Sequence, residues 1–371
     1  MTSVARERVD VAIERLDLAA YTVPTDEPES DGTFEWDSTT IVVVEAHAGG
    51  ETGLGYTYAP AAAAKLLEDE LVGLVEGSDA LAVGRVWLAL GARLRNAGRP
   101  GLGFCAVSAI DIALWDLKAR LLGVPLADLL GRAHDAVPVY GSGGFTSYGL
   151  GRLRGQLADW VEEGIPRVKV KVGREPGEDA ARLAAAREAI GAATELYVDA
   201  NGAYTRKQAL AWAERLAGEW DVSWLEEPVS SADFSGLRLL RDRGPAGLEI
   251  AAGEYGYVLA DFRNLLAAGA VDCLQADVTR CGGITGLLRV AALCEAEGLD
   301  LSGHCAPGAS AHVLCAVHRP RHLEWFHDHV RVERLLFDGT LEPVGGFLRP
   351  DSERPGHGLE LKRADAEPYA A

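Results

Sequence analysis

From residue 137 onward the sequence repeats one pattern: a short apolar segment, a loop, and a longer stretch with helical periodicity. Short apolar runs bounded by turn residues are typical of buried parallel strands, and the stretches between them are long enough for crossover helices. Eight such strands predict a modified (β/α)8 barrel of the TIM type, which is an α/β fold. The predicted strands are 137–140, 167–172, 196–199, 223–226, 249–252, 271–275, 299–302 and 322–324.

A doubly wound sheet is the alternative arrangement of these elements. Such a sheet binds a dinucleotide through a glycine-rich turn that follows a strand. No predicted strand is followed directly by the spacing GxGxxG, and we interpret the glycines at Gly149, Gly151, Gly282 and Gly283 as turns. The sequence therefore favours the barrel and argues against an NAD-dependent oxidoreductase.

The first 131 residues differ from this pattern, because three strand-like segments precede three helical ones. This order predicts an α+β unit of one domain's length. The segment 21–37 is polar and acidic and contains Pro24, Pro28 and Gly32, so we expect a long loop that acts as a lid. A floppy surface excursion is the alternative. The predicted strands are 8–18, 39–45 and 52–58, and the predicted helices are 61–74, 80–96 and 107–122.

These patterns divide the chain into three parts. We expect an α+β capping domain with its specificity lid at 1–131 and a catalytic barrel at 132–336. A C-terminal segment, 337–371, is rich in proline and glycine and is expected to pack back on the capping domain.

The predicted strand 167–172 carries two lysines on one face. Lys169 and Lys171 alternate with valines, which is the two-residue period of a β-strand. Both faces of a strand inside a parallel sheet are covered, and buried ammonium groups are costly unless partners accept them. An edge strand with solvated lysines is the simpler interpretation of this pattern alone. The residues at the ends of the following strands favour a site.

Three successive strands end in a carboxylate at nearly equal intervals of about one βα unit: Asp199, Glu226 and Glu254. The carboxyl ends of barrel strands share one rim, so these groups converge and would repel one another without a cation. All-oxygen ligands favour Mg²⁺, and Mn²⁺ less strongly. A single strand-end carboxylate is more often a helix cap or surface charge, and strand alternation does not separate Glu226 from its neighbour Glu227.

The last strands add a possible acid–base pair. A lone His304 would more often be structural, but Asp277 ends the preceding strand and could orient the ring and hold its proton. Glu324 ends the final strand, and Asn201 follows the strand that carries Asp199.

Taken together, the strand-end motifs resemble the enolase superfamily and, within it, the mandelate racemase-like group (the mandelate racemase/muconate lactonizing enzyme family). The helix 108–122, with the turn residues that follow it, also resembles that family's domain junction. The motifs are Lys169-Val-Lys171, Val198-Asp-Ala-Asn201, Trp224-Leu-Glu-Glu-Pro228, Ala252-Gly-Glu254, Asp277 before Gly282-Gly283, Gly303-His304 and Leu323-Glu324.

The resemblance implies a role for each of these residues. It implies that Asp199, Glu226 and Glu254 hold the metal, which favours Glu226 over Glu227. It makes Lys171 the base on one substrate face, tuned by Lys169, and places the pair Asp277–His304 on the opposite face. Glu324 corresponds to an acid that hydrogen-bonds the substrate carboxylate, while Asn201 and Tyr21, at the start of the lid, are the candidate substrate-binding residues.

The chemistry of these groups suits removal of a proton α to a carboxylate. This step creates an enediolate, whose charge a divalent cation and a protonated Glu324 can neutralise. The base must be neutral, and a free lysine has a pKa of about 10.4. A neighbouring ammonium and the metal should lower the pKa of Lys171 towards roughly 7–8.

We therefore expect an enolase-superfamily lyase that dehydrates a sugar acid to a 2-keto-3-deoxy acid. Racemisation or epimerisation of a 2-hydroxy acid is the second choice, because it uses the same groups. A non-catalytic barrel that only binds ligands is the alternative of another class. A binding protein has no need of this set of carboxylates, lysines and a histidine dyad.

Composition narrows the setting of this activity. The apolar and charged fractions, 48% and 25%, are those of a soluble globular protein, and the net charge of −19 disfavours nucleic acid and anionic membranes as partners. No signal peptide is apparent, so we expect a cytoplasmic protein, and the resemblance implies a homo-oligomer. Most of the six scattered cysteines are expected to be small core residues, and none is expected to have a catalytic or disulfide role.

Overall fold

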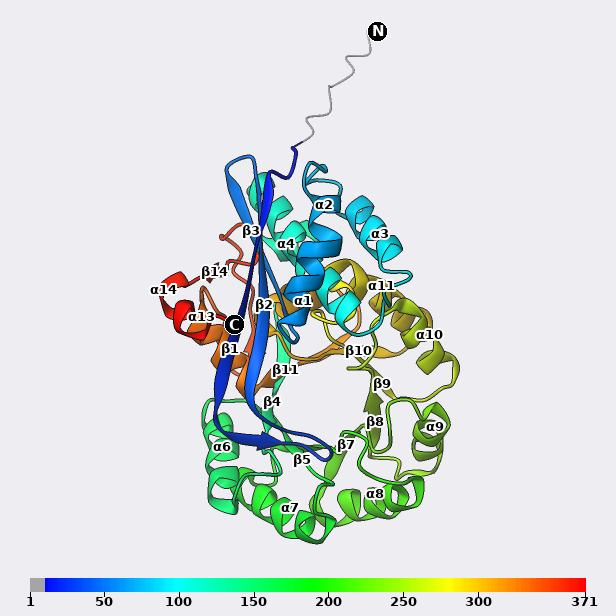
Figure 1. Ribbon diagram of the computed structural model, residues 1–371. Coiled ribbons are helices and arrows are strands. Elements are labelled where there is room, and N and C mark those ends of the chain that lie inside the picture. Colours follow the sequence, from blue (N-terminus) through cyan, green and yellow to red (C-terminus); the bar gives the residue numbers. More distant parts are fainter. Residues whose placement is uncertain (1–10) are drawn as a thin grey trace.

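The larger part of the chain is a closed parallel barrel, seen in the computed structural model, which describes residues 11–371. The eight strands pair in sequence order and the last pairs with the first, so the predicted (β/α)8 fold is confirmed. Figure 1 shows the ring of strands with its helices outside. The barrel strands are β4 (Val137–Gly143), β5 (Arg167–Lys171), β6 (Glu195–Asp199), β7 (Val222–Glu226), β8 (Glu249–Ala252), β9 (Cys273–Ala276), β10 (Asp300–Gly303) and β11 (Pro320–Phe326).

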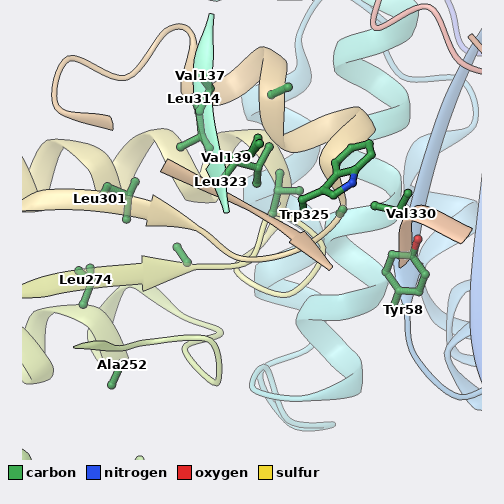
Figure 2. Close-up of a cluster of buried hydrophobic side chains, with 14 of the residues drawn as sticks. Tyr58, Val137, Val139, Ala252, Leu274, Leu301, Leu314, Leu323, Trp325 and Val330 are labelled. Carbon is green, nitrogen blue, oxygen red and sulfur yellow. The ribbon is translucent and has the colours of Figure 1, made fainter. Parts of the chain in front are cut away.

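The helices cover the outer face of the barrel because alternate strand residues are apolar. Val168 and Val170 of β5 are fully buried in one large apolar cluster with residues of the surrounding helices. Figure 2 shows part of this cluster, where Leu323 of β11 lies beside Val139 of β4. The helices are α6 (Leu150–Glu162), α7 (Pro176–Ile190), α8 (Arg206–Trp220), α9 (Phe234–Arg243), α10 (Leu259–Ala267), α11 (Gly283–Ala296), α12 (Pro307–Leu314) and α13 (His327–Leu336).

Aromatic side chains fill the inside of the barrel below its mouth. Tyr197 stacks with Trp224 at 5.5 Å between ring centroids, and the edge of Tyr140 meets Tyr197 at 5.6 Å. His322 completes the group, 5.0 Å from Trp224. These rings are buried, so the inward-facing residues of the strands form a solid floor and leave only the mouth for a ligand.

The capping domain is an antiparallel sheet with one long helix packed across it. Gly53 and Gly55 of β3 allow this close packing, because a Cβ at either position would overlap the backbone of α4. The sheet order is β1 (Arg15–Ser30), β2 (Glu35–Ala48) and β3 (Glu51–Tyr58). The helices are α1 (Ala62–Leu66), a π-helical turn (Leu67–Leu71), α2 (Val72–Val75), α3 (Val83–Arg93), α4 (Leu102–Leu122) and α5 (Leu126–Leu129).

The predicted long loop at 21–37 is wrong, because most of it is paired strand. β1 and β2 continue to pair past Pro24, the register shifts between Pro24 and Glu29, and pairing resumes up to Ser30 opposite Glu35. The prolines lie at the irregularity, where a missing N–H does least harm. The Asp31 carboxylate closes the turn by accepting from the N–H groups of Thr33 and Phe34. The predicted first strand, 8–18, begins outside the described residues, and its described part pairs from Arg15.

This hairpin, residues 21–37, is called the hairpin lid below, and its tip rests on the barrel. Figure 1 shows it running from the capping sheet across β4 and β5. The Ser30 and Thr146 hydroxyls lie 2.6 Å apart, and the Thr33 hydroxyl donates to the carbonyl of Asn201 at 3.3 Å. A Cβ at Gly32 would overlap the carbonyl oxygens of Ala200 and Val172. The tip therefore fits against the loops after β5 and β6.

The C-terminal segment joins the two larger parts. The Ala371 N–H donates to the carbonyl of Ala20, and the Arg363 guanidinium pairs with Glu45 at 2.5 Å. Its short elements are β12 (Phe337–Asp338), β13 (Phe347–Leu348), which pairs with β4, β14 (Glu360–Leu361), α14 (Arg363–Ala366) and a 3-10 turn (Glu367–Tyr369). Among residues 11–371 no helix has the length and apolar character to span a membrane.

We expect Gly32→Ala to loosen the hairpin lid while leaving the fold intact. The new methyl group overlaps backbone oxygens that cannot rotate away, so the tip must lift. Amide hydrogen exchange at residues 30–37 should then become at least several-fold faster. Gly73→Ala in α2 is the matched control, since a Cβ there meets nothing within 4 Å. Unchanged exchange in Gly32→Ala would show that the tip is not held by this contact.

Candidate active site

Three carboxylates meet at the mouth of the barrel. Asp199 ends β6 and Glu226 ends β7, and the two are register partners, while Glu254 follows β8. One oxygen of each lies within 4.8 Å of the others, and all three side chains are buried. Such a group repels itself in the absence of a cation, and buried hard-oxygen ligands fit Mg²⁺. The residues present therefore suit the metal that the sequence predicts.

Glu227, the competitor for this role, lies outside that group of three. Its backbone has a φ of 38°, a left-handed conformation that is costly for a glutamate. Its side chain is buried, and its Oε1 has no hydrogen-bond partner. The strand ends at Glu226, and the strained turn that follows directs the two neighbouring glutamates differently.

Both lysines of β5 point into the barrel and are buried, so the edge-strand interpretation is wrong. The Lys169 ammonium lies 2.7 Å from both oxygens of Glu226 and 2.7 Å from Oε1 of Glu324. It also lies 5.2 Å from the centre of the Tyr140 ring. The Lys171 ammonium lies 2.5 Å from Oδ2 of Asp199. Each lysine thus contacts one carboxylate of the group formed by Asp199, Glu226 and Glu254.

The expected lowering of the Lys171 pKa is not what the protein groups alone produce. Burial and the Lys169 ammonium lower this pKa. The adjacent Asp199 carboxylate raises it by a larger amount, so the net pKa of Lys171 is above the usual value of a lysine. If Lys171 acts as a base, the charge of Asp199 must be neutralised, as a cation bound to that carboxylate would do.

His304 and Asp277 form the expected pair. His304 Nδ1 lies 2.7 Å from Oδ2 of Asp277, whose Oδ1 accepts two hydrogen bonds from Thr279. His304 Nε2 lies 2.8 Å from Oε2 of Glu254. Burial opposes the charged imidazolium, but nearby acids, Glu254 and Glu324 among them, outweigh it, and the pKa of His304 is raised well above its usual value. A cation bound to Glu254 would weaken this effect, because it would neutralise part of the charge of that carboxylate.

Glu324 lies between Lys169 and His304. Its Oε2 is 3.3 Å from His304 Nε2, and its Oε1 faces Lys169. Burial raises the pKa of Glu324, but Lys169 and His304 lower it more, and the net pKa lies well below the usual range. The expectation of a protonated Glu324 is thus not met by the protein groups alone. A bound substrate carboxylate would place a second negative charge beside it and raise that pKa.

Of these groups, Lys171, Glu254 and His304 line a cavity of about 260 Å³. A larger hollow of about 650 Å³ lies between α3 and α10, and the carboxylates, lysines and histidine described above do not line it. The walls of the smaller cavity come from the hairpin lid and from the barrel loops. They are Asp31, Phe34, Trp36, Ser38, Thr39, Lys171, Asn201, Glu254, Tyr255, Arg280, His304, Cys305, Phe326 and His329.

Sequence reasoning missed several of these wall residues. Arg280 lies three residues after Asp277; its Nε is 3.5 Å from Oδ2 of Asp277, and its Nη1 donates to the carbonyl of Glu254 at 3.2 Å. The three-residue spacing from Asp277 could have identified Arg280 as a site residue, because both residues follow the same strand. His329 stacks on Tyr58 with ring centroids 3.4 Å apart, a contact between α13 and the capping sheet that no spacing reveals.

Cys305 departs from the expectation that the cysteines are only core residues. All six are buried and free, but Cys305 lines the cavity with its Sγ 3.3 Å from Oε2 of Glu324 and 3.5 Å from Nε2 of His304. Its backbone φ of 52° aims the side chain inward. Burial raises the pKa of this thiol, so it is a neutral wall of the site.

Tyr21 does not lie with these groups, so the expectation that it binds substrate does not fit the structure. It pairs with Ile41 in the capping sheet and is buried in the apolar core beside the C-terminal segment. Because 21–37 is paired strand, its first residue lies at the base of the hairpin lid and only the tip reaches the cavity. Asn201, the other candidate, lines the cavity.

The buried carboxyl group of Glu29 contacts Trp36, a residue of the cavity wall. Trp36 Nε1 donates to Oε2 of Glu29 at 2.9 Å, while Oε1 of Glu29 has no hydrogen-bond partner. Glu29 is fully buried. Burial and the nearby Asp328 raise the pKa of Glu29 to about 9. Glu29 is therefore neutral at pH 7 and positions the Trp36 ring.

Two family models match the chain along most of its length. The mandelate racemase / muconate lactonizing enzyme N-terminal domain matches residues 20–131, and the enolase C-terminal domain-like model matches residues 152–366. The chain belongs to the mandelate racemase/muconate lactonizing enzyme family of the enolase superfamily. The resemblance that the strand-end motifs indicate is thereby confirmed.

Individual relatives of this family member cover nearly the whole chain. It is 35% identical to 3,6-anhydro-alpha-L-galactonate cycloisomerase of Streptomyces coelicolor, over 94% of this chain and 97% of the relative. A mandelate racemase/muconate lactonizing enzyme-like protein from Rubrobacter xylanophilus is 65% identical, with a TM-score of 0.95 and coverage of 97% and 100%.

L-talarate/galactarate dehydratase from Salmonella typhimurium, solved with Mg and L-lyxarohydroxamate, is 29% identical with a TM-score of 0.89, over 100% of this chain and 96% of that one. Relatives named as dehydratases and cycloisomerases, some solved with bound magnesium, show that this family member is an enzyme. Its cofactor is Mg²⁺.

We expect Glu226→Gln to abolish Mg²⁺ binding, because an amide oxygen lacks the charge of the carboxylate it replaces. Glu227→Gln is the matched control: it makes the same change one position later and should keep Mg²⁺ affinity within a few-fold of wild type. Calorimetric Mg²⁺ titration of both variants measures this, and circular dichroism checks the fold. The reverse outcome would assign the metal to Glu227.

We also expect Glu29→Gln to change the pH dependence of stability. The folded state holds the Glu29 proton more tightly than the unfolded chain, so the resulting stability is complete below about pH 4.5 and is lost as the pH rises towards 9. The amide cannot ionise. Its free energy of unfolding, measured by urea titration, should match wild type near pH 5 and exceed it near pH 9 by more than about 1 kcal/mol. Glu27→Gln, on the same hairpin but exposed, should show no such difference.

Proposed function

We propose that this enzyme removes the proton α to a substrate carboxylate and that the net reaction is dehydration of a sugar acid to a 2-keto-3-deoxy acid. The observation that carries the proposal is the placement of two proton-transfer groups on different sides of one carboxylate cluster. Lys171 contacts Asp199 at one side of the cluster, and His304 contacts Glu254 at the other. A substrate held at the cluster would have one group on each face.

Asp199, Glu226 and Glu254 would hold the metal. When bound, Mg²⁺ supplies positive charge that stabilises the substrate carboxyl group as negative charge develops on it. Lys169 keeps Glu226 and Glu324 oriented, since its ammonium contacts both. Lys169 is fully buried between these acids, which raise its pKa well above the usual value despite burial, so it stays charged and serves as a fixed cation and not as the base.

The proposed steps balance in protons and bonds. Lys171, once neutral, takes the α-proton, and the electrons of the C–H bond move into the carboxyl group. His304 donates its proton to the β-hydroxyl, the C–O bond breaks, and water leaves. The resulting enol takes up a proton at carbon 3 and becomes the 2-keto acid. Asp277 stays hydrogen-bonded to His304 Nδ1 and holds the ring in place.

Two features support a carboxylate substrate of this kind. The reaction end of the cavity gathers Lys171, Arg280 and His304 beside a carboxylate cluster that could hold a metal ion. The named relatives include a sugar-acid dehydratase and a cycloisomerase of a sugar acid. Racemisation or another isomerisation is the second candidate, because Lys171 and His304 could equally return the proton to carbon 2.

Reaction in D₂O separates these outcomes. A screen of sugar acids with Mg²⁺ would first identify a substrate by formation of a keto acid or by loss of optical rotation. Dehydration should yield a 2-keto acid with deuterium at carbon 3. A product with inverted configuration, deuterium at carbon 2 and no keto acid would replace dehydration with racemisation.

The dyad can be tested with His304→Asn. This variant should lose at least about 100-fold in kcat, the usual contribution of a general acid or base. His318→Asn is the control, because that histidine is exposed on the outside of the barrel. If His304→Asn keeps full turnover on every wild-type substrate, the dyad is structural and the two-face mechanism is wrong.

A further inference from the structure

The two ends of the cavity differ in charge. Lys171, Arg280 and His304 line it at the barrel end, together with Glu254 of the carboxylate cluster. At the other end, Asp31 of the hairpin lid is the charged residue in the wall, and its carboxylate is already used to close the turn. The hairpin lid as a whole has no lysine or arginine but carries six acids, which are Asp26, Glu27, Glu29, Asp31, Glu35 and Asp37.

The cations near this acidic lid already have carboxylate partners. Arg152 pairs with Asp26 at 2.7 Å, and Arg174 pairs with Glu35 at 2.6 Å. Neither arginine lines the cavity. Arg280 does line it, but its guanidinium faces Asp277 and the carbonyl of Glu254 at the reaction end. A second substrate carboxylate at the lid end would therefore meet negative charge without a cation to balance it.

The remaining groups at the lid end are aromatic or neutral. The rings of Phe34 and Trp36 are nearly parallel, with centroids 6.1 Å apart, and Trp36 meets the edge of Phe145 at 5.5 Å. Ser38 and Thr39 add hydroxyl groups to the same wall. Ring faces and hydroxyls suit the C–H and O–H groups of an uncharged polyol or sugar ring.

We propose that the substrate is a monocarboxylic sugar acid of the aldonate class. This rests on the proposed function, which places the reacting carboxylate at the metal cluster. The uncharged end of the acid then lies against Phe34 and Trp36. An aldarate, which has a carboxylate at each end, is rejected because its distal charge would be desolvated beside Asp31 without a partner.

Matched pairs of acids test this class without the need for turnover. Gluconate against glucarate, and galactonate against galactarate, differ only at the distal carbon. Their affinities for Mg²⁺-loaded Lys171→Ala, which lacks the proposed base, are measured by calorimetry. In every pair that binds, the aldonate should bind at least 10-fold more tightly. An aldarate that binds as tightly as its partner, or failure of every aldonate to bind, overturns the proposal.

A positive charge placed on the lid should weaken the preference for aldonates. Phe34→Arg, added to the same variant, puts a cation on an exposed tip residue that lines the cavity. The gap between aldonate and aldarate should then narrow by at least several-fold. Leu88→Arg on α3 is the control, because it changes the net charge equally at an exposed leucine that does not line this cavity. An unchanged gap with Phe34→Arg would show that the lid does not face the distal end.

Failure of this proposal and failure of the proposed function give different results. Wild-type enzyme that forms no keto acid and exchanges no α-proton from any acid would contradict the proposed function, whatever the affinities are. Wild-type enzyme that dehydrates aldarates at least as well as aldonates, by kcat/KM, would keep the function and overturn the substrate class.

Discussion

The site depends on the contacts between the Lys169 ammonium group and its carboxylate partners. This ammonium group is fully buried and contacts two carboxylates, Glu226 and Glu324, on strands that are far apart in the sequence. A buried charge of this kind is tolerated only when its partners and geometry are good. Removing it would leave two acids facing each other. The lysine therefore holds Glu226 of the carboxylate cluster and Glu324 in one arrangement.

The barrel supplies the rigidity that this arrangement needs. Aromatic rings of Tyr140, Tyr197 and Trp224 fill the space below Lys169, and Trp224 also donates to Glu226 at 3.1 Å. Parallel register places Lys171 beside Asp199 and Asp199 beside Glu226. The charged groups thus sit on short strand ends with a packed floor beneath, which limits their movement and keeps water out.

The hairpin lid adds the part of the site that the barrel lacks. Its tip brings aromatic and neutral polar groups to the mouth, and its position depends on polar contacts with Thr146 and Asn201. Because it covers the site through a narrow tip, small changes in the tip alter the cavity without disturbing the barrel. The barrel therefore supplies the carboxylates, lysines and histidine of the candidate site, and the hairpin lid supplies the aromatic part of the cavity wall.

The sequence alone determined the barrel and the set of candidate site residues. Strand period placed Lys169 and Lys171 on one face, and the carboxyl ends of parallel strands brought Asp199, Glu226 and Glu254 to one rim, since both rules are local. Tertiary structure decided the rest. Continued pairing of β1 and β2 turned the expected loop into a hairpin, so its tip, and not Tyr21, reached the cavity. Contacts across the fold set the charge states of Lys171 and Glu324, because pKa values depend on neighbours that sequence spacing does not show.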